Sequence, residues 1–234
     1  MSAAWQTRTE RVLGKSGLAR LNQATAVVVG LGGVGSFAFE ALVRAGVGHM
    51  VAIDRDVVDE SNINRQLVAS VSTLGKSKAE VAKAHALDIN PSIDIVAHQV
   101  FLTADNAREL IPENTDVIID AIDSVGAKVD LIVYAKQKNT PIFSSMGMAN
   151  KTDPTKLTIG DIYKTSVDPL AKVMRKRLKD QGISGLTVVY STETPKVNPD
   201  DSTALGSVPY VPSVAGLILA SLAVGCITDE RKEL

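Results

Sequence analysis

The segment GLGGVGS, residues 30–36, follows the apolar run AVVV and opens a stretch with helical spacing of apolar residues. Gly30 permits a tight turn, Gly32 lets backbone N–H groups approach an anion closely, and Gly35 lets the helix pack on the strand. The unpaired N–H groups at the start of that helix carry the positive end of its dipole, which favours a bound phosphate. This strand, turn and helix predict a nucleotide-binding unit, although the glycines alone do not decide which nucleotide it binds.

Strands and helices are predicted to alternate along the first two thirds of the chain. Strand-like runs stand at residues 26–30, 49–54, 93–100, 116–122 and 141–145, with helical patterns near 33–45, 76–89, 104–111 and 125–138. After Gly147, the segments KLTIGDIYKT and LTVVYST are typical of antiparallel strands that flank a charged helix at 168–181, and an apolar helix begins near residue 212. The predicted fold is α/β: a Rossmann-like, mostly parallel sheet with helices on both faces and a C-terminal antiparallel elaboration.

The composition is ordinary for a soluble globular protein, with 45% hydrophobic residues, 22% charged residues and a net charge of −1. A nucleic-acid partner would therefore have to meet a local basic patch rather than the whole surface. The single cysteine excludes a disulfide framework and a zinc site built from cysteine pairs, and it suits a reducing cytoplasm. Residues 1–17 lack the apolar core of a signal peptide, so we expect a cytoplasmic protein.

The residues after Asp54 indicate which nucleotide binds. Asp54 ends the second strand, where an acid takes ribose hydroxyls, and a long polar loop, DRDVVDESNINRQ (54–66), replaces the short connection usual in an NAD-binding unit. Lys76 and Lys78 are expected in the first turn of the next helix, where a cation is unfavourable unless a polyphosphate lies beside it. Asp123 follows the carboxyl end of a strand, where α/β sheets bind ligands. Such charges around a triphosphate are typical of phosphoryl or nucleotidyl transfer with Mg²⁺.

The same segments resemble the signature of a known superfamily, the adenylating enzymes related to the ubiquitin-activating enzyme, which include ThiF, MoeB and HesA. Its motifs G-x-G-G-x-G, D-x-D, SNxNRQ, GxxK and DxxD stand here at residues 30–35, 54–56, 61–66, 75–78 and 120–123. The resemblance implies ATP rather than NAD, with Asp54 on the ribose and Mg²⁺ held by Asp123. The nucleotide-site residues that it implies are Gly30, Gly32, Gly33, Gly35, Asp54, Asp56, Asn62, Arg65, Gln66, Lys78, Asp123 and Ser124, of which Asn62, Arg65 and Lys78 contact the phosphates.

The superfamily also implies a homodimer in which an arginine near the N-terminus reaches the phosphates bound by the partner subunit. Arg11, in ERVLG, is the expected residue, and Arg8 is the second choice. The residues implied to be catalytic are Arg11, Arg65, Lys78 and Asp123.

The second half of the chain resembles one branch of that superfamily, the tRNA threonylcarbamoyladenosine dehydratases, in DPLAKVMRKRLK (168–179), YSTE (190–193) and GSVPYVPSVAGLI (206–218). The branch implies that ATP activates the threonyl carboxylate of the modified adenosine and that the acyl-adenylate then closes a ring within the same side chain, with loss of water. No enzyme nucleophile is needed, which fits the lack of a candidate cysteine. The resemblance implies a single ThiF-type domain over residues 1–234, with an ATP-binding part at 8–150 and a substrate, tRNA and dimer part at 151–234. It also implies tRNA, not DNA, as the partner, in a bacterial cytoplasm.

The helix at 168–181 is the candidate tRNA surface. Asp168 is the expected N-cap and Pro169 the first helical residue. Apolar residues at helical spacing should face the protein, namely Leu170, Val173, Met174 and Leu178. The basic residues left for tRNA phosphates, in the densest such cluster of a nearly neutral chain, are Lys172, Arg175, Lys176, Arg177 and Lys179.

Several alternatives stay open at the sequence level. The chain could instead adenylate a ubiquitin-like sulfur-carrier protein, although such enzymes usually carry the cysteine pairs that it lacks; an NAD oxidoreductase and an inactive scaffold are less favoured. Residues 202–228 carry no charge, a length that permits a membrane span, but prolines and glycines interrupt it and favour a helix buried in the core or a dimer interface. Structural roles are expected for Asp120, Cys226 and the histidines at 49, 85 and 98.

Overall fold

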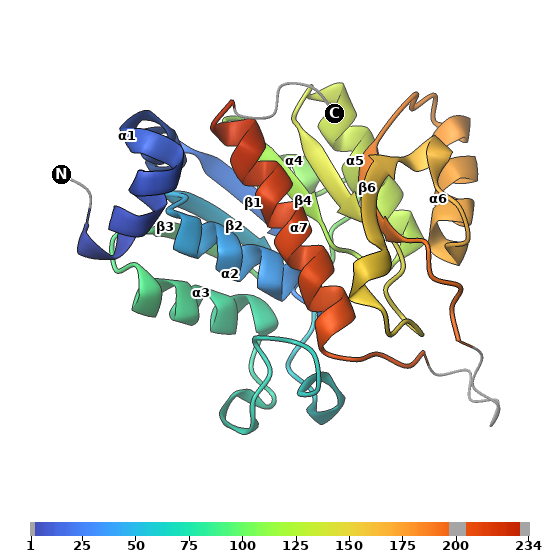
Figure 1. The fold of residues 1–234 in the computed structure, drawn as a ribbon, viewed down its shortest axis with the longest axis horizontal. Helices are drawn as coiled ribbons and strands as arrows, with labels where there is room; N and C mark the ends of the chain where they lie inside the picture. Colours follow the sequence, from blue (N-terminus) through green and yellow to red (C-terminus); the bar gives the residue numbers. More distant parts are fainter. Residues whose placement is uncertain (1–2, 197–204, 230–234) are drawn as a thin grey trace.

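The computed structural model describes residues 3–196 and 205–229, which form one seven-stranded sheet with the strand order β3-β2-β1-β4-β5-β7-β6 (Figure 1). All neighbouring strands are parallel except β6 and β7, which pair antiparallel. The predicted fold class is confirmed, and the C-terminal strands extend the same sheet because β7 also pairs in parallel with β5. The strands are β1 Thr25–Val29, β2 His49–Ile53, β3 Asp94–His98, β4 Val117–Asp120, β5 Ile142–Ser145, β6 Leu157–Asp161 and β7 Thr187–Ser191.

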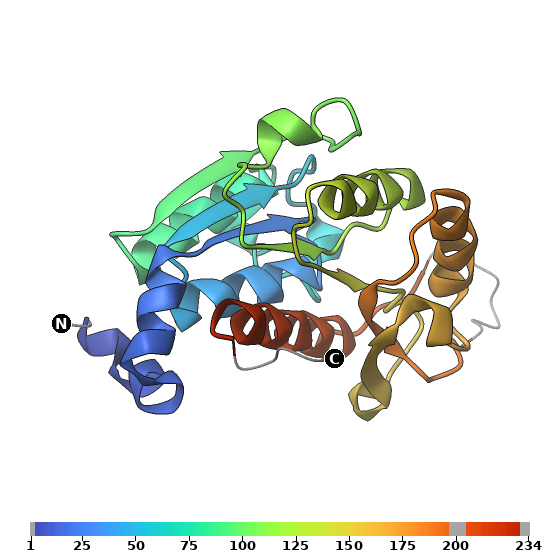
Figure 2. The same ribbon diagram turned by 90° about the horizontal axis from the view of Figure 1, so that it is seen from above.

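Helices cover both faces of this sheet (Figure 2). One face packs against α2, α3 and α7, and the other against α4, α5 and α6. β1 is buried along its whole length, as expected of a central strand in a parallel sheet, so its residues point alternately into the two cores. The helices are α1 Thr7–Gln23, α2 Gly35–Ala45, α3 Lys78–Ile89, α4 Ala107–Leu110, α5 Val125–Gln137, α6 Pro169–Asp180 and α7 Tyr210–Ile227.

Two predicted helices begin later than their sequence patterns suggested. Lys76 was expected in the first turn of α3, but the helix begins at Lys78, because the Ser77 hydroxyl accepts the Glu80 N–H and caps it. α4 spans only one turn of the predicted 104–111 segment. The Asn106 side chain accepts the Thr103 N–H (2.8 Å) and donates to the carbonyl of Phe101 (2.9 Å), which holds the preceding residues in a turn.

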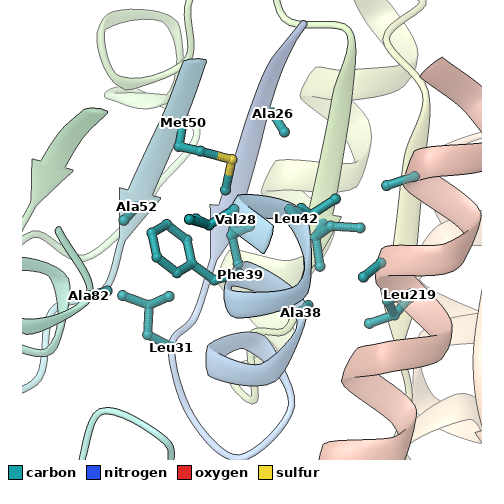
Figure 3. Close-up of a cluster of buried hydrophobic side chains, with 14 of the residues drawn as sticks. Ala26, Val28, Leu31, Ala38, Phe39, Leu42, Met50, Ala52, Ala82 and Leu219 are labelled. Carbon is teal, nitrogen blue, oxygen red and sulfur yellow. The ribbon is translucent and has the colours of Figure 1, made fainter. Parts of the chain in front are cut away.

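The apolar helix α7 lies against α2, β4 and β5, where Leu219 joins side chains of β1, β2 and α2 in one core (Figure 3). It is the one helix of the described chain that is long and apolar enough to cross a membrane, and 56% of it is buried inside the protein. The structure therefore uses this segment as a packed layer of the fold. Residues 202–204 of the uncharged stretch lie outside the described residues.

Gly216 sets how closely α7 approaches α2. A Cβ at this position would lie 2.2 Å from the carbonyl oxygen of Val34 and 3.0 Å from the backbone nitrogen of Ala38. Both atoms belong to the backbone at the start of α2, so neither can move without disturbing the glycine-rich turn before it.

We expect Gly216→Ala to lower the free energy of unfolding by about 1–3 kcal/mol, because the added methyl group forces α7 away from α2. Gly126→Ala is the matched control, since Gly126 lies in α5 and its added Cβ would meet nothing within 4 Å. The control should leave stability unchanged or raise it by up to about 1 kcal/mol. Urea unfolding of both variants measures the difference, and equal stabilities would contradict this account of the α2–α7 contact.

Candidate active site

A cavity of about 530 Å³ opens at the carboxyl ends of β1, β2, β4 and β5. The strand order reverses between β1 and β4, and such a switch point is where open α/β sheets bind ligands. Ten of the predicted nucleotide-site residues line this cavity: Gly30, Gly32, Gly33, Asp54, Asp56, Asn62, Arg65, Gln66, Lys78 and Asp123.

The glycine-rich turn is packed so tightly that side chains cannot be accommodated. Gly30 has a φ of +87°, and a Cβ there would lie 2.6 Å from the carbonyl oxygen of Ala121. Gly35 does not line the cavity, but its Cβ would lie 1.7 Å from the carbonyl oxygen of Gly30. Gly32, Gly33 and Val34 line the cavity directly before α2, and the start of a helix is a position that favours a bound anion.

Asp54 ties this turn to the loop that follows β2. Its buried carboxylate accepts the N–H of Leu31 (2.6 Å) and the N–H of Asp56 (2.8 Å). Burial raises the pKa of this carboxyl, although the two backbone hydrogen bonds and the Lys78 ammonium act to lower it. The carboxylate is thus held rigidly, with its orientation set by backbone groups on both sides.

Lys78 is a buried cation at the edge of the cavity. Its Nζ lies 3.0 Å from Oδ2 of Asp56, and its side chain is only 6% exposed, whereas Asp56 is half exposed. The ammonium stands at the first residue of α3, where the helix dipole opposes a positive charge. Asp56 offsets part of that repulsion through its carboxylate, 3.0 Å from the ammonium.

The loop after β2 brings three polar side chains to the same cavity. Asn62 caps the backbone of Asp59, while Arg65 donates to the carbonyl of Ser61 (2.9 Å) and to the side chain of Asn64 (2.8 Å). Gln66 is buried, and its Oε1 is the one buried side-chain oxygen or nitrogen of the described chain without a hydrogen-bond partner. An unsatisfied acceptor at a cavity wall is a place where a bound molecule can supply a donor.

The two aspartates after β4 have different surroundings. Asp123 is exposed and lines the cavity, whereas Asp120 is fully buried and does not. Asp120 accepts the Ser144 hydroxyl (2.6 Å) and pairs with Lys128 Nζ (3.0 Å), and Lys128 also donates to the carbonyl of Ile122 (2.9 Å). Asp120 therefore shapes the turn that presents Asp123, as its expected structural role requires.

Some predicted residues lie outside the cavity. Ser124 occupies the N-cap position of α5 and does not line the cavity. Arg8 and Arg11 lie exposed on α1. Cys226 is half-buried in α7, away from the cavity lining, and burial raises the pKa of its thiol. In the described part of the chain, no three His, Cys, Asp or Glu side chains are grouped as a metal site.

The wall opposite the glycine-rich turn was missed by sequence reasoning. It consists of the end of β5 and the loop after it, the first turn of α6 and a segment just before α7. The Asn64 side chain, in the polar loop, joins this wall by donating to the carbonyl of Ser207 (3.0 Å). No sequence spacing links these segments to the nucleotide motifs. The residues of this wall are Ser145, Met146, Gly147, Met148, Ala149, Leu170, Leu205, Gly206 and Ser207, whereas Pro212 of α7 also lines the cavity but lies beside Gly33 of the glycine-rich turn.

The basic helix α6 begins at this wall. Asp168 caps it by accepting the N–H of Ala171 (2.9 Å), as predicted, and Leu170 reaches the cavity. The prediction that Val173 faces the protein is wrong, because the buried stripe runs through Ala171, Met174 and Leu178 and leaves Val173 46% exposed.

Arg175 differs from the other cations of α6. It is half-buried and donates to the carbonyl (3.1 Å) and hydroxyl of Thr165, so it holds the helix to the preceding segment. The cations left exposed on the helix are Lys172, Lys176, Arg177 and Lys179.

The tRNA threonylcarbamoyladenosine dehydratase of Bacillus subtilis is 42% identical, over 93% of this chain and 92% of that protein. The enzyme of the same name from Escherichia coli is 38% identical, over 82% and 76%.

Solved structures agree with these relatives. The crystal structure of E. coli tRNA N6-threonylcarbamoyladenosine dehydratase, TcdA, in complex with AMP superposes with a TM-score of 0.92 at 36% identity, covering 98% of this chain and 97% of that one. The complex of the same enzyme with ATP has a TM-score of 0.90 at 35% identity, with the same coverage. The ThiF family pattern matches residues 5–234, and the chain therefore belongs to the ThiF family.

Proposed function

We propose that this protein uses ATP to dehydrate N6-threonylcarbamoyladenosine in tRNA, through an acyl-adenylate intermediate. The observation that carries the proposal is the two-walled cavity, in which the predicted phosphate-binding groups share one space with residues 145–149 and with residues from the part after 150. Relatives named for this activity match both halves, at up to 93% of the chain. We assign the ATP-binding part to residues 8–150, the substrate part to 151–234, and the reaction to the cytoplasm.

ATP fits the first wall of the cavity, by which we mean the glycine-rich turn and the loops after β2 and β4. Asp54 would accept the ribose hydroxyls, because its carboxylate is held in place by two backbone N–H groups. Lys78, Arg65 and Asn62 would hold the phosphates beyond the glycine-rich turn. Asp123 would hold Mg²⁺, which neutralises charge on the phosphates when bound; its exposed carboxylate at the cavity edge suits such a hard cation.

Two displacements complete the proposed reaction. The threonyl carboxylate attacks the α-phosphorus of ATP, and pyrophosphate leaves. A nucleophilic group of the same side chain then attacks the acyl carbon and loses a proton to solvent, so that the ring closes and AMP leaves with one carboxylate oxygen. The two wall surfaces supply position and charge, and no protein nucleophile is required. The position of Cys226 outside the cavity lining supports this scheme.

Incubation of the protein with ATP, Mg²⁺ and tRNA that bears threonylcarbamoyladenosine should yield a nucleoside lighter by one water, together with AMP, as measured by mass spectrometry. Cys226→Ala should keep the wild-type rate, because the thiol lies outside the cavity lining. If no water is lost under any condition, the proposed function is wrong. Adenylation of a sulfur-carrier C-terminus, with tRNA inert, would instead support the alternative enzyme class, whose named relatives match about half of this chain.

We further propose that tRNA follows α6 towards the cavity. The helix starts at the second wall, where Leu170 lines the cavity, and its exposed cations extend from there. Four such charges on one short helix can contact phosphates while the modified base enters the cavity. Arg175 would take part mainly by fixing the helix, since its guanidinium is committed to Thr165.

Charge reversal on this helix tests the tRNA path. Lys176→Glu with Arg177→Glu should weaken tRNA binding about tenfold or more and reduce its salt dependence by about one unit of slope per lost phosphate contact. ATP affinity should be unchanged, because neither residue lines the cavity. Lys136→Glu with Lys138→Glu, at the far end of α5, is the matched control for net charge. Equal tRNA affinities of the two double variants across a salt titration would show that the tRNA lies elsewhere.

A homodimer would complete the site. Arg11 lies exposed on α1 and does not line the cavity of its own chain, which leaves it free to enter a partner's cavity in the dimer that we propose. Residues from two chains would then share one active site.

Mixing inactive variants tests this composite site. Arg11→Ala and Asp123→Ala subunits should each be inactive. An equal mixture should regain about one quarter of the wild-type sites, because about half of the dimers are mixed and each mixed dimer has one intact site of two. Turnover after exchange of subunits measures the recovery, with the parallel pair Arg8→Ala and Asp123→Ala deciding between the two arginines. Mixtures as inactive as their parents, with mixed dimers verified, would contradict the composite site.

A further inference from the structure

A buried ion pair joins the start of α6 to the cavity wall. Lys151 Nζ lies 2.7 Å from Oδ2 of Asp168 and also donates to the carbonyl of Gly147. Both charged side chains are at most 1% exposed. Gly147 lines the cavity, and a Cβ there would lie 3.3 Å from both carboxylate oxygens of Asp168. One cluster thus connects the N-cap of the basic helix to the backbone of the wall opposite the glycine-rich turn.

This pair is poorly explained by stability alone. Removing two charges from water costs free energy that their attraction seldom recovers, and well-packed apolar residues often stabilise a fold as much or more. Its hydrogen bonds instead connect two segments of different function. Lys151 binds the carbonyl of the cavity loop, while Asp168 accepts the N–H of Ala171 in the first turn of α6.

Backbone strain marks the same position. Val167, directly before Asp168, has a φ of +66°, a region that a β-branched residue rarely adopts. The N–H of Asp168 donates to the carbonyl of Ser166 (2.7 Å), which closes a tight turn around Val167. The Val167 side chain is 48% exposed and gains little from burial in return. The turn directs the Asp168 carboxylate inward to Lys151, and strain of this kind is often found at functional sites.

We propose that Lys151 and Asp168 are positioning residues that fix the basic helix relative to the cavity wall, and thereby align the tRNA-borne acyl group with the nucleotide. The inference rests on the proposed function, because α6 is the proposed tRNA surface and the wall is where the acyl group would lie. The pair touches neither reactant directly; it sets the distance between two binding surfaces. Loss of this alignment should lower kcat more than it changes either affinity, since misplaced reactants still bind.

The double variant Lys151→Met with Asp168→Asn tests this role. It removes both buried charges together, and the introduced asparagine side chain retains an oxygen that caps α6. Asp168→Asn alone should melt at a clearly lower temperature, because it leaves a buried ammonium unpaired, and the double variant should recover much of that loss. At saturating ATP and tRNA, the recovered double variant should still turn over about tenfold more slowly than wild type, with both KM values within about twofold.

Two controls separate position from general stability. Glu193 is also buried and accepts backbone N–H groups of Thr152 and Asp153 on the same loop, outside the cavity lining, so Glu193→Gln should lower the melting temperature but keep kcat. Val167→Gly should also keep kcat, because glycine adopts a positive φ without strain and the turn before Asp168 is retained. A folded double variant with wild-type kcat would overturn the positioning role. If wild type converts no tRNA, the proposed function fails and this role fails with it.

Discussion

The active site depends on one steric constraint, the contact between the glycine-rich turn and the end of β4. At Gly30 and Gly35 even a single added carbon would lie within 2.6 Å of a carbonyl oxygen. Because the backbones approach so closely, the turn after β1 lies beside the loop after β4, and Asp54 can bridge the turn to the loop after β2. Three loops are thus brought to one cavity by backbone packing, before any ligand binds.

The buried charges behind this cavity are paired with one another, whereas the charges at its edge are open to a ligand. Lys128 and Lys151 are buried and paired behind the loops that follow β4 and β5, where they hold carbonyl groups of those loops. Lys78 is buried at the cavity edge, while Asp123 is exposed to it. The inner pairs organise backbone, and the outer charges remain available to a ligand. Such preorganised groups need little rearrangement during a reaction, which is the main way that a protein stabilises developing charge.

The cavity joins two parts of the chain that differ in their sequence signals. The nucleotide wall comes from contiguous motifs, each a few residues long, that follow β1, β2 and β4. The opposite wall combines the loop after β5 with residues 205–207 before α7, and one side chain of the polar loop, Asn64, connects the two walls. The second wall therefore combines residues 145–149 with residues from the C-terminal part of the chain.

The sequence alone was sufficient for the fold class and for the order of strands and helices after residue 24, because a glycine turn, a strand-end acid or a capped helix is specified by residues a few positions apart. It did not predict α1, and the ten predicted residues that line the cavity came from the family resemblance as well as from these local motifs. Other features required tertiary structure. Helical spacing could not tell that Val173 is exposed or that Arg175 contacts Thr165, since both depend on where the rest of the chain packs. Lys128 and Lys151 look like surface residues in the sequence, yet their carboxylate partners lie 8 and 17 positions away, and burial made them internal. Local motifs are determined by neighbours in sequence, whereas burial and the composition of the second wall are determined by contacts between distant segments.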